Sequence, residues 1–440
     1  MSERMGVLRL AMPVLAQQLV VTLMMVADTA MLGWLDDPAA LAALGGVAPV
    51  LWMLMVFGRG VGTGAFAVVA RRVGEGAGEE AAIGAAAALR VSLVAGALAG
   101  LAMASVARPV ATAIGLSGHA ATHAVCYVSI LGATEPFAFF GLTAASSLRA
   151  AGDTFRPMLA GTIANVTNVL LNWLLIFGKA GFPQLGVAGA AIATAFSQTL
   201  NASLLAVLLG FGPLSLRFRH SRAVRLHHLR TLARPALPAL GYPLVSNTGY
   251  LVFTGEVATL GELPLAAHRI AIAAESLSFL SGDAFGVAGG SLVGRSLGAG
   301  DVSRARRLAS HAMFLGVLAM GAVGVLLAAI PQQLSSLISA TPAVRQVAAR
   351  ALPVAALGQV PFALCIVLSG VFNGAGATRL PLYAGAVGMW LVRIPMAWLL
   401  AHKMQLGLAG AWGAAGLHFL IQAILMVILF AGSGWSRQKI

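Results

Sequence analysis

Long apolar runs separated by short polar segments dominate the pattern along the chain. Each run is at least as long as the ~20 residues that a helix needs to cross a bilayer core. Because lipid offers no partner to unpaired backbone groups, such runs are expected to be helical. The sequence predicts twelve spans, at 9–35, 46–70, 82–107, 120–147, 157–178, 187–212, 235–260, 265–294, 308–331, 346–372, 381–401 and 407–432.

The two halves of this pattern repeat each other. Three patches fall into register at a shift of 224 residues: 41–43 on 265–267, 68–81 on 292–305, and 149–161 on 373–385. A fourth patch, LGVAGAA at 185–191, falls on LGLAGAW at 406–412 with a shift of 221. Six spans return the chain to its starting side, so the halves are expected to be parallel repeats related by an axis along the membrane normal.

The predicted fold class is therefore an all-α polytopic membrane protein with twelve transmembrane helices in two parallel, pseudo-symmetric six-helix bundles. The expected domains are an N-terminal lobe at 1–212, a basic cytoplasmic linker at 213–234 and a C-terminal lobe at 235–440. The first apolar run is too long for a signal-peptide core, and we expect it to remain in the mature protein.

Composition supports a membrane protein and excludes a soluble one. Only 10% of the 440 residues are charged and 59% are hydrophobic, whereas about a quarter of an ordinary globular chain is charged. The net charge of +14 could suggest nucleic-acid binding. The basic residues, however, lie mostly in short loops between apolar runs, where membrane topology places them.

The distribution of Lys and Arg predicts the orientation of the chain. With the N-terminus inside, the outer loops hold five basic residues, Arg108, Lys179, Arg345, Arg350 and Lys403. The inner segments hold nineteen, namely Arg4, Arg9, Arg71, Arg72, Arg149, Arg156, Arg217, Arg219, Arg222, Arg225, Arg230, Arg234, Arg295, Arg304, Arg306, Arg307, Arg379, Arg437 and Lys439. This asymmetry predicts a multi-pass protein of the bacterial inner membrane with both termini cytoplasmic. The basic linker either controls this topology or also contacts phosphate or lipid headgroups.

The sequence offers no enzymatic chemistry. Cys126 and Cys365 each stand alone in an apolar stretch, so neither a disulfide framework nor a metal cluster is expected. No Ser/His/Asp or HExxH constellation occurs, and we predict no enzyme and no cofactor.

Several motifs together resemble the multidrug and toxic compound extrusion (MATE) family along the whole chain. They are Pro13, VADT at 26–29, RAAGDT at 149–154, the stretch from Asn165 to Gly178, LGVAGAAIAT, LPLAAHRIAIAAESLSFLSG and LVGRSLGAGD. The resemblance implies export of bulky, often cationic drugs in exchange for H⁺ or Na⁺ by rocker-switch alternating access. It also implies small-molecule drugs and membrane lipids as partners, no nucleic acid, and a monomer.

Acidic residues inside lipid are costly and usually functional. Five lie in apolar runs: Asp28, Glu135, Glu256, Glu275 and Asp283. Asp28 shares a helix face with Gln17 and Met24, which lie eleven and four residues before it. Its carboxylate could hold a proton, Na⁺ or the positive charge of a drug. A structural aspartate near a membrane boundary is the alternative.

The predicted fifth span carries three amides on one face. Asn165, Asn168 and Asn172 recur at i, i+3 and i+7, which calls either for partners across the bundle or for a ligand. The resemblance implies that Asn168 and Asn172, with Thr194 of the sixth span, supply cation ligands beside Asp28. Asn165 joins Gln17, Met24 and Asp28 as a candidate substrate residue. Many family members carry Asp where this chain has Asn172, so H⁺ and Na⁺ both stay open. No other metal site is expected.

The second lobe offers a weaker set of candidates, Glu256, Glu275 and Asp283. Some family members place a coupling Glu in the seventh span, where this chain has Ser246, so that second-lobe site is expected to be absent. Glu135 precedes Pro136 and is either a hinge or packing residue or a proton site. His268 is either a structural histidine or a proton relay.

Two other function classes were weighed. A flippase for lipid-linked or cell-wall precursors would use a cationic cavity, and Arg59, Arg90, Arg269 and Arg393 within or beside spans keep it open. A membrane enzyme would need a polar catalytic cluster, which the sequence does not offer.

Overall fold

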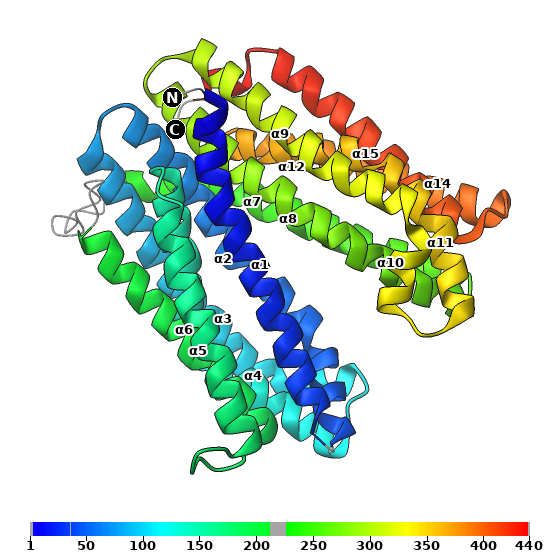
Figure 1. Ribbon diagram of the computed structural model, residues 1–440. Coiled ribbons are helices and arrows are strands. Elements are labelled where there is room, and N and C mark those ends of the chain that lie inside the picture. Colours follow the sequence, from blue (N-terminus) through cyan, green and yellow to red (C-terminus); the bar gives the residue numbers. More distant parts are fainter. Residues whose placement is uncertain (1–2, 36, 212–225, 439–440) are drawn as a thin grey trace. The chain divides into compact units, whose positions relative to one another are not determined.

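The computed structural model describes residues 3–35, 37–211 and 226–438, and within these ranges the regular structure is helical, with no strand (Figure 1). The first half of the chain contains six long helices. They are α1 (Glu3–Gly33), α2 (Pro38–Gly74), α3 (Gly78–Ala113), α4 (Gly118–Ala150), α5 (Phe155–Phe177) and α6 (Gly186–Phe211).

The second half follows the same order with more interruptions. Its elements are α7 (Leu226–Ala258), α8 (Glu262–Gly298), α9 (Val302–Ala329), α10 (Pro331–Ile338), α11 (Pro342–Leu357), α12 (Gln359–Gly374), α13 (Arg379–Ala386), η2 (Val387–Arg393), α14 (Ile394–Ala397), η3 (Trp398–Lys403), α15 (Gly407–Ala431) and η4 (Trp435–Arg437). The π-helices η2 and η3 lie within one continuous stretch from Arg379 to Lys403.

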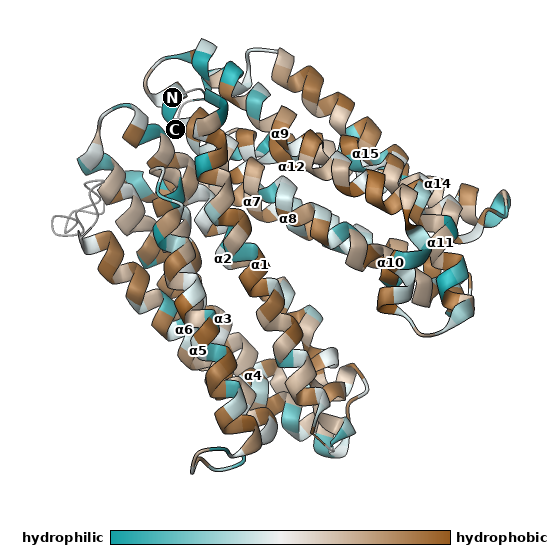
Figure 2. Cartoon of the chain, viewed as in Figure 1, coloured by the Kyte–Doolittle hydropathy of each residue, from teal (hydrophilic) through white to brown (hydrophobic). Residues whose placement is uncertain are grey.

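Ten helical stretches in the described part of the chain are long and apolar enough to cross a membrane, and Figure 2 shows hydrophobic residues along most of their length. The pair α11 and α12, bent by 54°, would make an eleventh. The remaining long helix, α7, is continuous over 33 residues, but polar residues and prolines interrupt its apolar sequence. These elements correspond in order to the twelve predicted spans.

Two boundaries differ from the sequence prediction. The tenth span was expected to be one helix over 346–372, but it is broken at Gly358. Pro361 cannot donate a backbone hydrogen bond to the carbonyl of Leu357, which explains a break at this place. The seventh helix begins at Leu226, so residues 226–234 of the expected linker are helical. The rest of that linker, 213–225, lies outside the described residues.

The chain forms two compact units that differ slightly from its sequence halves. The N-terminal unit comprises Pro13–Ala236, and the C-terminal unit comprises Met1–Met12 with Leu237–Ile440. In the N-terminal unit α4 packs against α2, α3 and α6, and in the C-terminal unit α12 packs against α8, α9 and α15. The fourth and tenth spans are thus each at the centre of their own unit, as equivalent parts of a repeat would be.

Glycines allow helices within each unit to approach closely. A Cβ atom at Gly100 of α3 would lie 2.0 Å from the backbone oxygen of Gly132 in α4. At the equivalent position of the second half, Gly324 of α9, the nearest atom is Cβ of Gln359 at 3.1 Å. The contact is therefore repeated in the second half, although with more space.

The eleventh span contains one more residue than the fifth. Gly189 of α6 and Gly410 of α15 each lie against the backbone of a leucine, Leu175 and Leu400, with a Cβ distance of 2.7 Å in both. The two leucines are 225 residues apart, whereas the start of the same spans repeats at 224. A π-turn accommodates one inserted residue in a helix, so η2, which precedes Leu400, accounts for this change of register.

Candidate functional site

Asp28 lies in the last two turns of α1 and faces α5. The amide nitrogen of Asn172 donates to Oδ1 of Asp28 at 2.5 Å. Asn172 is 1% exposed, and its own amide oxygen is buried without a hydrogen-bond partner among the described residues. A carboxylate and an unused amide oxygen therefore lie side by side.

Asn168 completes the contact one turn earlier on α5. The orientation that satisfies both ends of its amide directs the nitrogen at Oδ1 of Asp28 (3.0 Å) and the oxygen at the backbone N–H of Thr194 (3.2 Å). In the opposite orientation its oxygen accepts from the Asn172 amide at 3.1 Å. The structure thus brings together Asp28, Asn168, Asn172 and Thr194, which the sequence grouped as cation-binding candidates.

Two further residues belong to this cluster and were not among the sequence candidates. Ser197 of α6 is 6% exposed, and in the second of these two amide orientations the nitrogen of Asn168 donates to its hydroxyl at 3.4 Å. Tyr127 of α4 lies near Thr194 and interacts electrostatically with Asp28. The spacing of Thr194 and Ser197, three residues apart on one helix face, was the available signal for Ser197. Tyr127 resembles an ordinary packing aromatic in sequence.

We call these six residues, Asp28, Tyr127, Asn168, Asn172, Thr194 and Ser197, the Asp28 cluster. All of them lie within the N-terminal unit. It contains one carboxylate and otherwise neutral oxygen and nitrogen groups. Hard cations such as Na⁺ prefer oxygen ligands, and a carboxylate can instead take up a proton. The cluster can therefore hold a single positive charge.

The three other first-lobe candidates lie outside this cluster. Gln17 accepts a hydrogen bond from Arg149 at 2.7 Å and packs on Gly161, about 16 Å along α1 from Asp28 at 1.5 Å rise per residue. Met24 is partly buried one turn before Asp28. The amide nitrogen of Asn165 is buried without a hydrogen-bond partner among the described residues.

The remaining acids are dispersed over the two units. Glu135 of α4 is 1% exposed, and one of its carboxylate oxygens has no hydrogen-bond partner among the described residues. In the C-terminal unit, Glu256 of α7 interacts electrostatically with His402 and Glu275 of α8 with Arg393. Asp283 lies two turns after Glu275 on α8 and is partly buried. No three His, Cys, Asp or Glu side chains of the described chain are grouped as a metal site.

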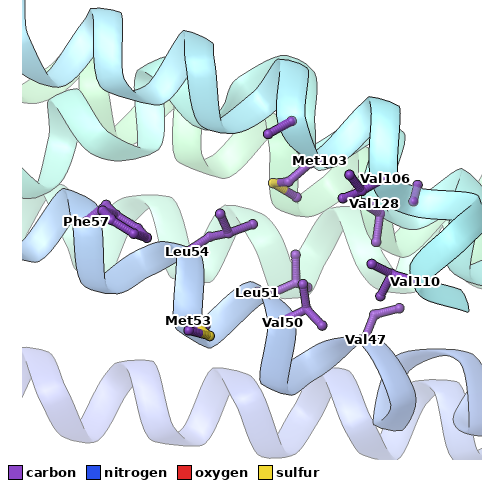
Figure 3. Close-up of a pocket in the computed structure, with 12 residues that line it drawn as sticks. Val47, Val50, Leu51, Met53, Leu54, Phe57, Met103, Val106, Val110 and Val128 are labelled. Atoms are coloured by element: carbon purple, nitrogen blue, oxygen red, sulfur yellow. The ribbon is translucent and has the colours of Figure 1, made fainter. Parts of the chain in front are cut away.

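An apolar cavity of about 230 Å³ lies apart from these polar groups, between α2, α3 and α4 (Figure 3). Leu51, Leu54 and Phe57 of α2 face Met103 and Val106 of α3 across it. Its twelve lining residues are all aliphatic, aromatic or methionine. It offers no group that could neutralise a cation.

A polytopic helical protein with two repeated halves and a carboxylate within its first span is the pattern of a membrane transporter. The model of the MatE family matches residues 13–174 and again residues 238–399. The two matches cover most of the chain and begin 225 residues apart, which confirms the internal repeat. The chain belongs to the MatE family, whose members are membrane transporters and not enzymes.

Several curated relatives cover nearly the whole chain. It is 28% identical to the probable multidrug resistance protein NorM of Thermotoga maritima, over 99% of this chain and 94% of that protein. Identity is 30% to the protein of the same description from Burkholderia mallei (96% and 91%) and 31% to that of Pseudomonas aeruginosa (94% and 86%).

Solved structures agree with the fold. A crystal structure of MATE in the straight conformation has a TM-score of 0.91 at 22% identity, covering 98% of this chain and 96% of that one. An outward-facing multidrug resistance MATE family transporter matches equally, at 0.91 and 23% identity. These matches confirm the predicted fold class of twelve helices in two six-helix lobes.

Proposed function

We propose that this protein is a multidrug efflux transporter that exchanges cationic or amphipathic drugs for H⁺ or Na⁺ at the Asp28 cluster. The observation that carries this proposal is the contact between Asp28 and the two buried amides of Asn168 and Asn172. A single carboxylate in a helix long enough to span the bilayer is costly to keep charged, so a role in binding a cation explains its presence. The curated relatives named multidrug resistance proteins support the substrate class.

Exchange follows from the presence of one negative charge. Two unit charges about 4 Å apart interact with about 4 kcal/mol at an effective dielectric constant of about 20. A drug cation and a coupling ion that both use Asp28 therefore exclude each other, because one carboxylate cannot compensate both. Each ion that binds would release the other, and this is the elementary step of antiport.

The donor set leaves room for either coupling ion. The free amide oxygen of Asn172 and the hydroxyls of Thr194, Ser197 and Tyr127 are neutral oxygen groups near Asp28, of the kind that Na⁺ accepts. A proton would need only the carboxylate. The cluster supports coupling to H⁺ or Na⁺ and does not require a cofactor.

The repeat supports alternating access. The family model matches each half separately, and two similar bundles can move against each other about a central site. We infer a rocker-switch movement of the two lobes, expected at 1–212 and 235–440. Since one chain contains both halves, we infer that it works as a monomer, in contact with its drugs and with membrane lipids.

The proposed location is a bacterial inner membrane, with both termini in the cytoplasm. Nineteen basic residues against five on the other side support this orientation by the positive-inside rule. Helices α2 and α8 each end in one of these inner basic segments, with Arg71 and Arg72 in the last turn of α2 and Arg295 in that of α8.

The flippase alternative receives less support. Of its four arginines, Arg393 is 3% exposed and is surrounded by aromatic rings. A side chain in this position cannot line a cationic cavity for phosphate. Transport of a lipid-linked phosphate in the absence of any drug efflux would nevertheless establish the flippase.

We expect replacement of Asn168 or Asn172 by alanine to change the affinity of Asp28 for the coupling ion about tenfold, since a hydrogen bond to a charged group contributes about 1.5–3 kcal/mol. Both amides donate to the Asp28 carboxylate and stabilise its ionised form. Their loss should therefore strengthen H⁺ binding, whereas the loss of an amide oxygen ligand should weaken Na⁺ binding. The measurement is Na⁺- or pH-driven efflux of a cationic dye from vesicles. Matched variants in the C-terminal unit, Glu256→Gln, Glu275→Gln and Asp283→Asn, should change the ion dependence less. A larger coupling defect in any of these three variants would show that the coupling site lies in the C-terminal unit.

The ion itself is identified by the driving gradient. Inverted vesicles are given either a pH gradient or a Na⁺ gradient, and accumulation of a cationic dye is followed. Accumulation under one gradient and its collapse by the matching ionophore is the expected result. If the vesicles accumulated as much dye without any ion gradient as with one, secondary antiport would be contradicted.

A further inference from the structure

Arg393 has an unusual environment for an arginine. It is the last residue of the π-helix η2 and only 3% of its surface is exposed. Its guanidinium lies 4.1 Å from the ring centre of Phe253, 5.7 Å from that of Phe419 and 5.8 Å from that of Tyr250. These aromatic contacts cover the guanidinium but supply no hydrogen-bond acceptor for its N–H groups in the ring plane.

One edge of the guanidinium has no partner. Neither Nε nor Nη2 makes a hydrogen bond with any described residue. These two nitrogens form the edge whose parallel N–H groups match the two oxygens of a carboxylate. A buried guanidinium without such an acceptor is strongly disfavoured, so the edge calls for a carboxylate in its immediate surroundings.

Glu275 is the acid that is placed to supply it. It lies two helical turns after His268 on α8, on the same face. His268 is completely buried and packs edge-on against Phe253 with ring centres 5.6 Å apart, and Phe253 is the ring that covers Arg393. Glu275 also interacts electrostatically with Arg393, without a direct ion pair between the two side chains among the described residues.

The other ionisable groups around this pair are few. Tyr250 of α7, His268 and Arg269 of α8, and His418 of α15 interact electrostatically with Arg393, Glu275 or one another. On α9 the basic groups are Arg304, Arg306, Arg307 and His311, all within its first ten residues, and on α11 they are Arg345 and Arg350; α12 carries only the thiol of Cys365. Among the groups that interact electrostatically with Arg393, Glu275 is the carboxylate.

We propose that Arg393 is a positioning residue that binds the carboxylate of Glu275 on its free edge, keeps it ionised, and thereby confines cation coupling to the N-terminal unit. Protonation of Glu275 would leave a buried guanidinium without a counter-charge, which is the costly state. A carboxylate held in this way is not available to a coupling proton or to a drug cation. The pair itself does not depend on the proposed function, whereas the consequence for coupling rests on it.

The first test concerns the ion pair and needs no transport. Infrared difference spectra of the purified protein are recorded across the near-neutral pH range, in which a protonated carboxyl gives its own band. We expect no Glu275 band in the wild-type protein and a titrating band in Arg393→Met, which disappears in the double variant Glu275→Gln/Arg393→Met. The matched control Arg269→Met removes an exposed arginine of the same helix as Glu275 and should give no band. A titrating Glu275 band in the wild-type protein, or none in Arg393→Met, would overturn the proposal.

A second measurement applies if Arg393→Met does not fold. Thermal unfolding in detergent is compared for Glu275→Gln, Arg393→Gln and the double variant. If Arg393 had a purely structural role, the losses of thermal stability in the two single variants should add up in the double variant. If the two residues form a pair, the double variant should be more stable than Arg393→Gln or Glu275→Gln alone. Arg393→Lys, which keeps the charge but lacks the two-pronged edge, should retain part of the stability. Additive losses would contradict the pairing.

The third measurement concerns coupling. In proteoliposomes, Arg393→Met should add a second protonatable carboxylate, so that the pH dependence of dye efflux becomes steeper and Glu275→Gln in the same background removes the change. An unchanged pH profile together with a titrating Glu275 band would reject the confinement of coupling but retain the ion pair. If the wild-type protein shows no ion-coupled efflux, the proposed function fails while the spectra still decide the pairing.

Discussion

Replacement of Asp28 by asparagine is expected to reduce ion-coupled efflux to the level of vesicles without the protein. The substitution keeps the size of the side chain but removes the only carboxylate of the cluster. The lost attraction, about 4 kcal/mol for a cation about 4 Å away, corresponds to roughly a thousandfold in affinity. Efflux of a cationic dye at matched protein level in the membrane is the measurement.

The control for this variant is Glu256→Gln. Glu256 is also a partly buried acid in a long helix, with one carboxylate oxygen that has no hydrogen-bond partner among the described residues. If any intramembrane acid were sufficient for coupling, both variants should fail. We expect only Asp28→Asn to fail, and near-normal efflux in Asp28→Asn would refute the role of this residue.

Introduction of a methyl group at Gly100 is expected to destabilise the N-terminal unit by about 3 kcal/mol, at the upper end of the usual cost of overpacking. The added Cβ would lie 2.0 Å from the Gly132 backbone oxygen, so α3 and α4 must separate. Because α4 also carries Tyr127, the Asp28 cluster should be disturbed as well. Thermal unfolding of Gly100→Ala in detergent measures the effect.

Two matched glycines show whether the cost arises from this contact. Gly324→Ala, the equivalent change in the second half, meets its nearest atom at 3.1 Å and should cost clearly less. Gly45→Ala on the exposed side of α2 has no atom within 4 Å and should be neutral or slightly stabilising. Equal stability of all three variants would contradict the close approach of α3 and α4.

The fold class was predictable because the bilayer imposes the same length and apolarity on every span. Breaks inside a span were less accessible. The break at Gly358 depends on a proline at 361 whose partner carbonyl is at Leu357, whereas Pro136 leaves α4 continuous. A proline therefore breaks one helix and leaves the other continuous, and packing against neighbouring helices decides between the two.

The register shift of the eleventh span was visible only in part. The sequence shows a change from 224 to 221 between two patches, which was interpreted as a shorter outer loop. The contacts of Gly189 and Gly410 show that one residue is first gained within the helix, at the π-helix η2. A helical insertion leaves no composition signal, because π-turns have no characteristic residue.

The candidate site was predictable where polar residues stand out against an apolar background. Asn168 and Asn172 are conspicuous for this reason, and their contact with Asp28 follows from the shared face of α5. Tyr127 and Ser197 were missed because a tyrosine or a serine in a span is common. Gln17 shares a helical face with Asp28 but reaches Arg149 instead, since eleven residues along a helix are too far for a common ligand.

Arg393 was noted only as one of four arginines near spans. Its significance depends on tertiary contacts, namely the rings of Phe253 and Phe419 and the electrostatic interaction with Glu275. These residues come from four separate segments between 253 and 419 and share no sequence motif. Such a pairing cannot be found without the three-dimensional structure.

The central claim is that one carboxylate binds either the coupling ion or the drug. Equilibrium binding of a monovalent cationic dye to the purified protein, titrated against pH and against Na⁺, tests it most directly. The account predicts that one of the two ions displaces the dye with a one-to-one competition slope, and that Asp28→Asn loses both the tight dye binding and its ion dependence. Wild-type dye binding that is unaffected by both ions, or competition that persists in Asp28→Asn, would contradict it.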